Sequence, residues 1–271
     1  VEKNNGIINL GERLKNKVRT KTIIEAIETN SIPLENDLEH LSPDYSISDI
    51  TFLPVIPNPG KILCIGLNYE KHRIETKRDV SGFPTIFTRF SESQTAHNQY
   101  LVKPNVSDRF DFEGELAIII GKGGKNIQEK DAINHIAGYS CYNDGSIRDW
   151  QKHTSQFIPG KNFPKTGSFG PSMVLRNSIP DYRELKIQTR LNDQIVQDAC
   201  LDQLIFDIPR LIAYCSTFNF LSIGDVIVTG TPGGVGDRRD PPLYLKEGDK
   251  VEVEISKVGL LKNYVINESS L

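Results

Sequence analysis

Two glutamates separated by a single residue are the first feature of this sequence that suggests chemistry. Glu113 and Glu115 lie in a stretch, residues 111–121, that continues as an apolar run closed by glycine. Such a run is typical of a strand entering a core, and residues two apart on a strand share a face. Neighbouring buried carboxylates repel each other unless a cation neutralises them, and oxygen ligands favour Mg²⁺, Mn²⁺ or Ca²⁺. The pair therefore indicates either a divalent-metal site or a solvated strand end.

A third carboxylate, Asp144, lies in the segment Asn-Asp-Gly-Ser at residues 143–146. A carboxylate from a second element would complete a facial set of oxygen ligands and leave positions for water and substrate. Arg148, four residues further on, can hold a substrate carboxylate. Both residues also have a plainer interpretation, because the segment favours a turn and Arg148 can pair with Asp149 on the surface.

His72 and Glu75 are three residues apart, a spacing that brings an imidazole and a carboxylate together on one helical turn. Such a pair can orient a histidine as a general base, although the same spacing also fits a surface ion pair. Lys161 is framed by proline, glycine and aromatic residues. It can stabilise a developing oxyanion beside a metal or be an ordinary solvated lysine.

A glycine-rich loop at residues 230–236 follows an apolar strand pattern. It is neither a P-loop nor a dinucleotide-binding fingerprint, because no Gly-Lys-Ser/Thr follows and the glycine spacing differs. The N–H groups of such a loop can approach a small anionic ligand, with Thr231 adding a hydroxyl, or the loop can be a simple tight turn.

Composition narrows the class of protein. The chain has 271 residues and a formal net charge of −3, so no basic surface suggests nucleic acid or an anionic membrane as partner. The mean hydropathy is −0.35, and no apolar run approaches the roughly 18 residues of a membrane helix. The four cysteines are widely spaced in apolar surroundings, which favours reduced core cysteines of a cytoplasmic protein: Cys64, Cys141, Cys200 and Cys215.

The elements that position these groups are mostly strands. Residues 1–54 are more polar, with one amphipathic helix candidate at 20–29, and predict a small N-terminal subdomain or arm. A proline-stiffened linker at 55–60 leads into the main domain, residues 55–271. Besides the glutamate strand, strands are predicted at 61–66, 85–90, 185–191, 194–197, 225–229 and 250–256, and the strand at 250–256 is expected to be half exposed. Helices are predicted at 129–137 and after Asp207. This pattern predicts a mostly β or α+β roll.

In their order along the chain, five segments resemble the fumarylacetoacetate hydrolase superfamily. The resemblance is closest to its shorter members, the acylpyruvate and fumarylpyruvate hydrolases and the 2-hydroxyhepta-2,4-diene-1,7-dioate isomerases. The segments are residues 60–69 with His72 and Glu75, 111–121, 143–151, 160–171 and 224–236. Together they cover the chain from about residue 55 to its end.

The resemblance implies a mixed β-sandwich roll with a few short helices, a homodimer, and a Mg²⁺ or Mn²⁺ site. Each implied role falls on a matching position: Glu113, Glu115 and Asp144 as metal ligands, His72 and Glu75 as a dyad on a lid-like segment, Lys161 beside the metal, and Arg148, Gln151 and Thr231 against the substrate. Asn68 stands where longer hydrolases carry a further aspartate ligand. Arg89 and Gly145 also depart from the family pattern, and these departures bear on the substrate more than on the metal.

The function predicted from the resemblance is a divalent-metal-dependent hydrolase. It would cleave a C–C bond in a 1,3-diketo acid of the acylpyruvate or fumarylpyruvate type through a metal-stabilised enolate, with His72 activating water. One alternative keeps the site but changes the reaction to decarboxylation or isomerisation of a 2-oxo acid in an aromatic-degradation pathway. The other alternative, from a different class, is a non-catalytic metal-binding oligomer. Residues 70–82 are predicted to be mobile.

Overall fold

The computed structural model describes residues 1–3, 6–13, 21–33, 38–77, 79 and 81–270. Contacts divide the chain into two units, Val1–Phe52 and Leu53–Leu271. The first unit holds a three-stranded sheet and short helices: β1 (Glu2–Lys3), β2 (Gly6–Ile7), β3 (Tyr45–Ser46), α1 (Leu10–Arg13), α2 (Ile23–Glu28) and the 3-10 turn Ile47–Asp49. Helix α2 begins later than predicted because Thr22 caps it, accepting the N–H of Glu25 at 3.1 Å. Residue 20, where the predicted helix starts, lies outside the described residues.

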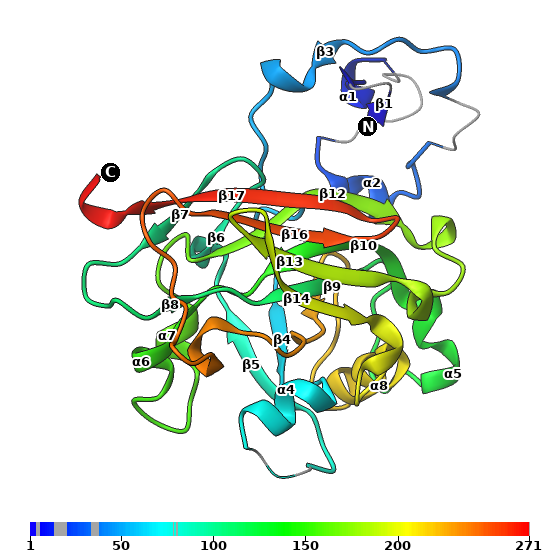
Figure 1. Cartoon of the computed structure of the whole chain (residues 1–271). Coiled ribbons are helices and arrows are strands. Elements are labelled where there is room, and N and C mark those ends of the chain that lie inside the picture. Colours follow the sequence, from blue (N-terminus) through cyan, green and yellow to red (C-terminus); the bar gives the residue numbers. More distant parts are fainter. Residues whose placement is uncertain (4–5, 14–20, 34–37, 78, 80, 271) are drawn as a thin grey trace. The chain divides into compact units, whose positions relative to one another are not determined.

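The second unit is built on a mixed seven-stranded sheet (Figure 1). Its order is β5-β4-β15-β9-β10-β12-β6, with β15 parallel to β4 and antiparallel to β9. The strands are β4 (Ile62–Gly66), β5 (Thr85–Arg89), β6 (Gln94–Thr95), β9 (Gly114–Ile120), β10 (Ile136–Asn143), β12 (Gly167–Leu175) and β15 (Val226–Val228). Every residue of β9 is buried, as the continuous apolar run of this central strand predicts.

A five-stranded sheet packs against the first sheet (Figure 1). Its order is β14-β13-β16-β17-β7, from the strands β7 (Tyr100–Lys103), β13 (Lys186–Leu191), β14 (Gln194–Cys200), β16 (Lys250–Ile255) and β17 (Gly259–Asn267). Leu116 and Ile118 of β9 share one apolar core with Ile187 and Val253 of the second sheet. A two-stranded pair, β8 (Phe110–Asp111) with β11 (Ser146–Ile147), completes the β structure of this unit within the described residues.

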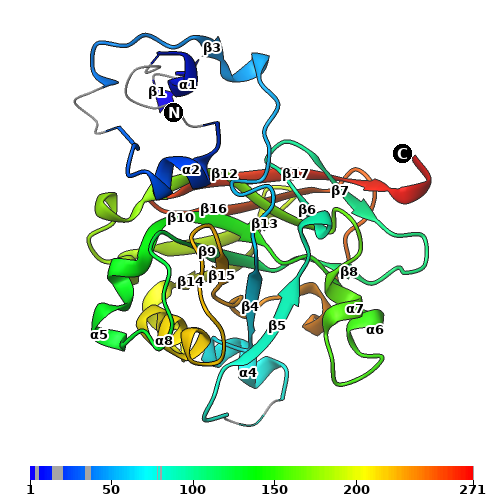
Figure 2. The ribbon, with the colours of Figure 1, turned by 180° about the vertical axis from the view of Figure 1, so that it is seen from behind.

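The helices of this unit are short (Figure 2). They are α4 (Glu70–Glu75), α5 (Glu129–Ala132), α6 (Arg148–Gln151), α7 (Ile158–Lys161) and α8 (Ile208–Phe218), with 3-10 turns at Ser91–Ser93, Ile133–His135, Arg176–Ser178, Tyr182–Glu184, Leu201–Gln203, Gly236–Arg238 and Glu268–Ser270. The Asp207 carboxylate caps α8 by accepting the N–H of Arg210 at 3.0 Å, as predicted. In the part of the chain that the structure describes, no helix is long and apolar enough to cross a membrane.

This architecture confirms the predicted α+β roll with few helices. The predicted strands at 61–66, 85–90, 185–191, 194–197 and 225–229 are in place, with ends shifted by at most three residues. Asn192 and Asp193 form a two-residue hairpin turn between the paired strands β13 and β14, with φ angles of 50° and 68°. The four cysteines are free; Cys200 is half-buried, and the other three are buried.

Three predictions about local structure were wrong or incomplete. The helix at 129–137 ends early, because Ile136 pairs with Ile120 and begins strand β10. The linker at 55–60 is anchored by its first residues, since Val55 and Ile56 are buried. Strand β16 is less exposed than predicted, because it lies between β13 and β17, and Glu252 is buried. The mobility of residues 70–82 stays a prediction: residues 78 and 80 lie outside the described residues.

Candidate active site

Strand pairing brings three carboxylates together at one end of the central sheet. The register of β9 and β10 places Gly114 opposite Asn143, and the Asp144 N–H donates to the Glu113 carbonyl at 2.8 Å. Asp144 therefore lies across from Glu113, while Glu115 is two residues along the same strand. Ligand oxygens of Glu113, Glu115 and Asp144 all lie within 4.8 Å of one another, and all three residues are buried.

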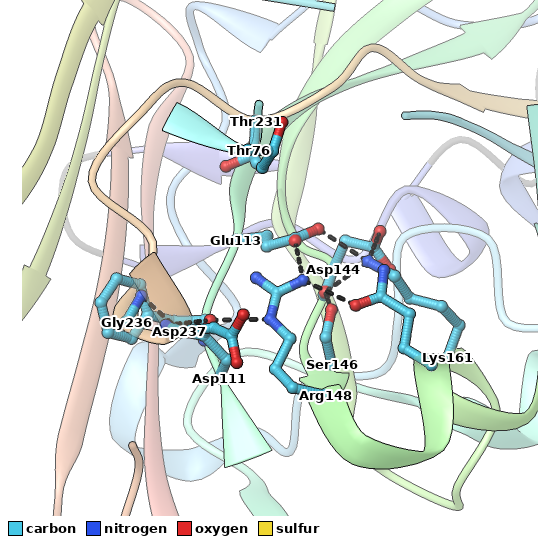
Figure 3. A network of polar contacts seen from close by, with 12 residues as sticks. Thr76, Asp111, Glu113, Asp144, Ser146, Arg148, Lys161, Thr231, Gly236 and Asp237 are labelled. Carbon is cyan, nitrogen blue, oxygen red and sulfur yellow. Dashed lines mark hydrogen bonds and ion pairs between the residues drawn. The ribbon is translucent and has the colours of Figure 1, made fainter. Parts of the chain in front are cut away.

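Two cations hold Glu113 (Figure 3). Arg148 lies between Asp111 and Glu113, with Nε–Oδ2 and Nη1–Oε1 distances of 2.8 and 2.6 Å. Lys161 bridges Glu113 and Asp144, with Nζ–O distances of 2.7 and 2.6 Å. Burial alone would raise the pKa of Glu113, but Arg148 and Lys161 outweigh it and lower that pKa to about 2. The same two carboxylates raise the pKa of Lys161 against the opposite effect of burial.

Arg89 is a third cation of the site, and the sequence did not assign it a role. It ends the apolar strand β5, and its Nη1 donates to Asp144 Oδ1 at 2.6 Å and to the Gly145 carbonyl at 2.8 Å. Its side chain and that of Asp144 are fully buried. A lone arginine in a buried strand needs an acidic partner, so this position carried a signal that could have been followed.

Glu115 has a different environment. Among the described residues, no lysine, arginine or histidine forms an ion pair with its carboxylate, and its hydrogen-bond donor is the Gly230 N–H, 2.5 Å from Oε2. Burial raises the pKa of Glu115 well above its usual value, and the neighbouring Asp144 and Glu113 raise it further.

The donor set fits a divalent cation. Four buried carboxylates, Asp111, Glu113, Glu115 and Asp144, face three buried cations, Arg89, Arg148 and Lys161, which leaves one negative charge. That charge has its weakest compensation at Glu115, beside the carboxylates of Glu113 and Asp144. Hard oxygen ligands around an excess negative charge are the environment that Mg²⁺ and Mn²⁺ prefer.

The predicted dyad lies on helix α4 beside this cluster. His72 Nδ1 is 3.3 Å from Glu75 Oε2, and the Gly234 N–H lies 3.3 and 3.2 Å from the two Glu75 oxygens. His72 is 6% exposed and lines a cavity of about 370 Å³. The same cavity is lined by six of the other residues that the sequence singled out: Glu113, Glu115, Arg148, Gln151, Lys161 and Thr231.

The glycine loop has a use that the sequence did not predict. Its N–H groups bind carboxylates of the protein itself: Gly230 binds Glu115, Gly234 binds Glu75, and Gly236 and Asp237 bind Asp111 at 2.8 and 2.9 Å. Gly234 has a φ of 104°, and a Cβ there would lie 2.2 Å from the Val196 carbonyl, so a side chain is excluded. These four donors of the loop support the site and are not available to a ligand.

Three further side chains complete the description. Gln151 accepts a hydrogen bond from Arg148 Nη1 at 2.9 Å, and Thr231 donates to the Gly114 carbonyl at 3.0 Å. Arg148 Nη2 is buried and has no partner within the described residues. The Asn68 amide bonds the backbone, at the Phe206 N–H and carbonyl and at the Thr229 carbonyl, with distances of 2.7–3.0 Å, and so joins the segment after β4 to neighbouring loops.

Known proteins with a similar sequence or structure indicate the family of this chain. The model of the fumarylacetoacetate (FAA) hydrolase C-terminal family matches residues 61–266. A mitochondrial oxaloacetate tautomerase of Xenopus laevis is 41% identical over 243 residues, 89% of this chain and 75% of that protein. The structure of a fumarylacetoacetate hydrolase from Exiguobacterium antarcticum has a TM-score of 0.82 at 30% identity, covering 94% of this chain and 91% of the other. A fumarylpyruvate hydrolase from Pseudomonas aeruginosa, solved with Mn²⁺ and pyruvate, has a TM-score of 0.70 at 27% identity, covering 77% and 90%. This chain belongs to the fumarylacetoacetate hydrolase family.

Proposed function

We propose that this protein is a divalent-metal-dependent isomerase that interconverts the keto and enol forms of a 2-oxo acid of the oxaloacetate type. The observation that carries the proposal is one cavity lined both by Glu113 and Glu115 of the carboxylate cluster and by His72, a proton-transfer group oriented by Glu75. The relative named an oxaloacetate tautomerase supports the reaction class. The sequence alone favoured C–C hydrolysis, and isomerisation was its alternative; the comparisons favour that alternative.

The cavity offers a buried donor to an anionic substrate. Four cations line it, Arg148, Lys152, Lys161 and Arg238, beside the carboxylates of Glu113, Glu115 and Asp237. Arg148 Nη2 has no partner within the described residues, so a substrate carboxylate can use it once a bound cation offsets the glutamates. Glu113, Glu115 and Asp144 would hold the metal, which supplies Lewis-acid polarisation of the keto oxygen when bound. Lys161 adds a fixed positive charge beside the same oxygen ligands.

The reaction then needs one proton to move. His72 removes a proton from the carbon next to the keto group. The electron pair of that C–H bond forms the C=C bond of the enol, and the π pair of the C=O bond moves onto the oxygen. The proton is delivered to the oxygen, so no atom or electron is gained or lost. Glu75 stabilises the imidazolium during the transfer, and the Gly234 N–H holds Glu75 in place. An imidazole is suited to this transfer near neutral pH.

Hydrolysis of an acylpyruvate or fumarylpyruvate is the second candidate, favoured by the likeness to the fumarylpyruvate hydrolase structure. In that reaction the same pair, His72 and Glu75, would activate a water molecule. The homodimer, the cytoplasmic location and the choice between Mg²⁺ and Mn²⁺ stay predictions.

The test is one substrate panel with Mg²⁺ on four proteins: wild type, His72→Asn, Glu115→Gln and the control His135→Asn, which alters a half-buried histidine outside the cavity, hydrogen-bonded to the Lys122 carbonyl. Enol loss from oxaloacetate is followed by absorbance, and pyruvate release is followed with oxaloacetate, acetylpyruvate and fumarylpyruvate. We expect tautomerisation in wild type and His135→Asn, with a fall of about 10²–10⁴ in kcat for His72→Asn. Pyruvate from the diketo acids without tautomerisation would replace the isomerase with the hydrolase, and pyruvate from oxaloacetate alone would indicate a decarboxylase.

A further inference from the structure

We propose that Gln197 is a positioning residue of the active site, contributed by the second sheet. Gln197 lies on β14 at the edge of the five-stranded sheet and is 2% exposed. None of the residues with a role in the proposed reaction comes from that sheet. The inference rests on the proposed function for its catalytic part, whereas its effect on metal affinity stands without it.

The Gln197 amide joins the metal-ligand strand to the glycine loop. Its Oε1 accepts the N–H of Gly114, the residue between the two glutamates, at 2.9 Å. Its Nε2 donates to Thr231 Oγ1 and to the Pro232 carbonyl, both at 2.8 Å. The backbone donor at Gly114 fixes which end of the amide is oxygen, and both ends are satisfied.

This arrangement fixes the direction of the Thr231 hydroxyl. Nε2 carries only donors, so Thr231 Oγ1 accepts from Gln197, and its single proton goes to the Gly114 carbonyl at 3.0 Å. Thr231, which lines the cavity, therefore has only an acceptor lone pair left for a ligand. Such an acceptor pairs with the O–H of an enol and not with a keto oxygen, which links Gln197 to the proposed reaction.

Gln197 also acts on the proposed metal ligands. Thr231 and Pro232, which it binds, directly follow Gly230, whose N–H holds Glu115. The second sheet approaches so closely at this point that a Cβ on Gly114 would lie 2.1 Å from Thr189 Oγ1. Gln197 thus fixes the distance between the strand that carries Glu115 and the loop that orients it.

The experiment compares Gln197→Glu and Gln197→Ala with two controls. Gln197→Glu keeps the acceptor for Gly114 and removes both donors. Ile187→Ala, in the core of the same sheet, lowers the Tm without touching the site, and Asp198→Asn changes an exposed neighbour on β14. The readouts are the Mn²⁺ dissociation constant by electron paramagnetic resonance, the Tm with chelator, and kcat and KM for oxaloacetate.

We expect both Gln197 variants to raise the Mn²⁺ dissociation constant and to lower kcat by about tenfold each, since groups that orient metal ligands typically have effects of this size. Ile187→Ala should lower the Tm with the Mn²⁺ dissociation constant unchanged, and Asp198→Asn should change neither. Thr231→Val combined with Gln197→Glu should lower kcat no further than the stronger single variant does, because both remove the same interaction.

The opposite results would overturn the proposal. A Gln197 variant that lowers only the Tm, as Ile187→Ala does, would show a merely structural glutamine. Multiplicative losses of kcat in the double variant would show that Gln197 does not act through Thr231. If wild type fails to tautomerise oxaloacetate, the proposed function fails, while the Mn²⁺ dissociation constants still decide whether Gln197 positions Glu115.

Discussion

The carboxylates on the two sides of this site are held by different chemistry. On one side Glu113 and Asp144 are held by the charged side chains Arg148, Lys161 and Arg89. On the other side Glu115 and Glu75 accept hydrogen bonds from the glycine loop, and the imidazole of His72 is the further partner of Glu75. Charged partners cancel charge, whereas backbone amides orient a carboxylate without cancelling it.

The difference explains where an added cation is needed. The pKa of Glu113 falls to about 2, and the pKa of Glu115 is raised, although the two residues are next but one on the chain. The side held by backbone amides therefore has no cation to balance Glu115, whereas the side held by charged side chains anchors Glu113 and Asp144. The first predictions below change one side or the other and ask whether the opposite side follows, and the last provides a reference from outside the site.

The largest effect is expected from Lys161→Met, which removes the cation shared by Glu113 and Asp144. The kcat should fall by about 10²–10³, as for loss of a group that stabilises developing charge. With chelator present the Tm should also fall, and Mg²⁺ should restore part of it by neutralising the same carboxylates. Lys257→Met, which removes an exposed ion pair with Glu184, is the control. An unchanged Tm for Lys161→Met in chelator would contradict the charge-based description of this side.

The next effect in size is a difference between Glu113→Gln and Glu115→Gln, which should change the free energy of unfolding differently. Both variants should lose most of their Mg²⁺ affinity, measured by calorimetry. In chelator, Glu113→Gln should lower the free energy of unfolding by about 3 kcal/mol, because Arg148 and Lys161 lose a buried counter-charge. Glu115→Gln should leave the free energy of unfolding unchanged or raise it, since Gln keeps an acceptor for Gly230 and cannot ionise beside Glu113 and Asp144. Equal losses in the two variants would remove the distinction between the sides.

A smaller effect separates two adjacent arginines at the edge of the loop. Arg239 donates to the carbonyls of Gly234 and Val196, whereas Arg238 lines the cavity. Arg239→Gln should lower the free energy of unfolding by about 2 kcal/mol. Arg238→Gln should leave stability unchanged and raise KM for oxaloacetate about fivefold, as expected for a partly exposed ion pair of about 1 kcal/mol. This expectation assumes that Arg238 binds the carboxylate of oxaloacetate that is farther from the keto group. If Arg238→Gln raises KM equally for oxaloacetate and for its 4-methyl ester, which lacks that charge, Arg238 does not bind this carboxylate.

The smallest effect lies outside the site and provides a pH reference for it. Burial, with a contribution from Lys262, lowers the pKa of His97 to about 4. The folded state therefore favours neutral His97, and the stability this gives is present above the unfolded value near 6.5 and is lost as pH falls toward 4. Between pH 7 and pH 5 the Tm of wild type should fall more than that of His97→Gln, whose side chain does not titrate. Parallel curves would assign the acid sensitivity to other groups.

The parts of the site that could be predicted from sequence are those set by local geometry. The two-residue spacing of Glu113 and Glu115 fixes a shared face on a strand, and the three-residue spacing of His72 and Glu75 fixes one helical turn. The structure brings these residues together with Asp144 and Lys161. Their roles in metal binding and proton transfer stay predictions.

The parts that could not be predicted depend on contacts between distant segments. Arg89 is 55 residues from Asp144, Gln197 is 83 from Gly114, and Gly230 is 115 from Glu115. The hydrophobic periodicity of the sequence does not predict such pairings, because they arise from the order of strands in the sheets. The predicted end of the helix at 129–137 was wrong for the same reason, because from Ile136 onward pairing with β9 outweighed the local helical pattern.

The amide donors of the glycine loop have a consequence for how this family can diversify. A hydrogen bond from a backbone N–H is encoded by the path of the chain, which here needs glycine at positions 230, 234 and 236. Exchanges of side chain elsewhere around the cavity leave that path in place. Side chains at the cavity mouth, such as Lys152 and Arg238, carry no such constraint. Substrate preference can therefore drift, or be redesigned, at the mouth while the placement of Glu115 and Glu75 is inherited intact.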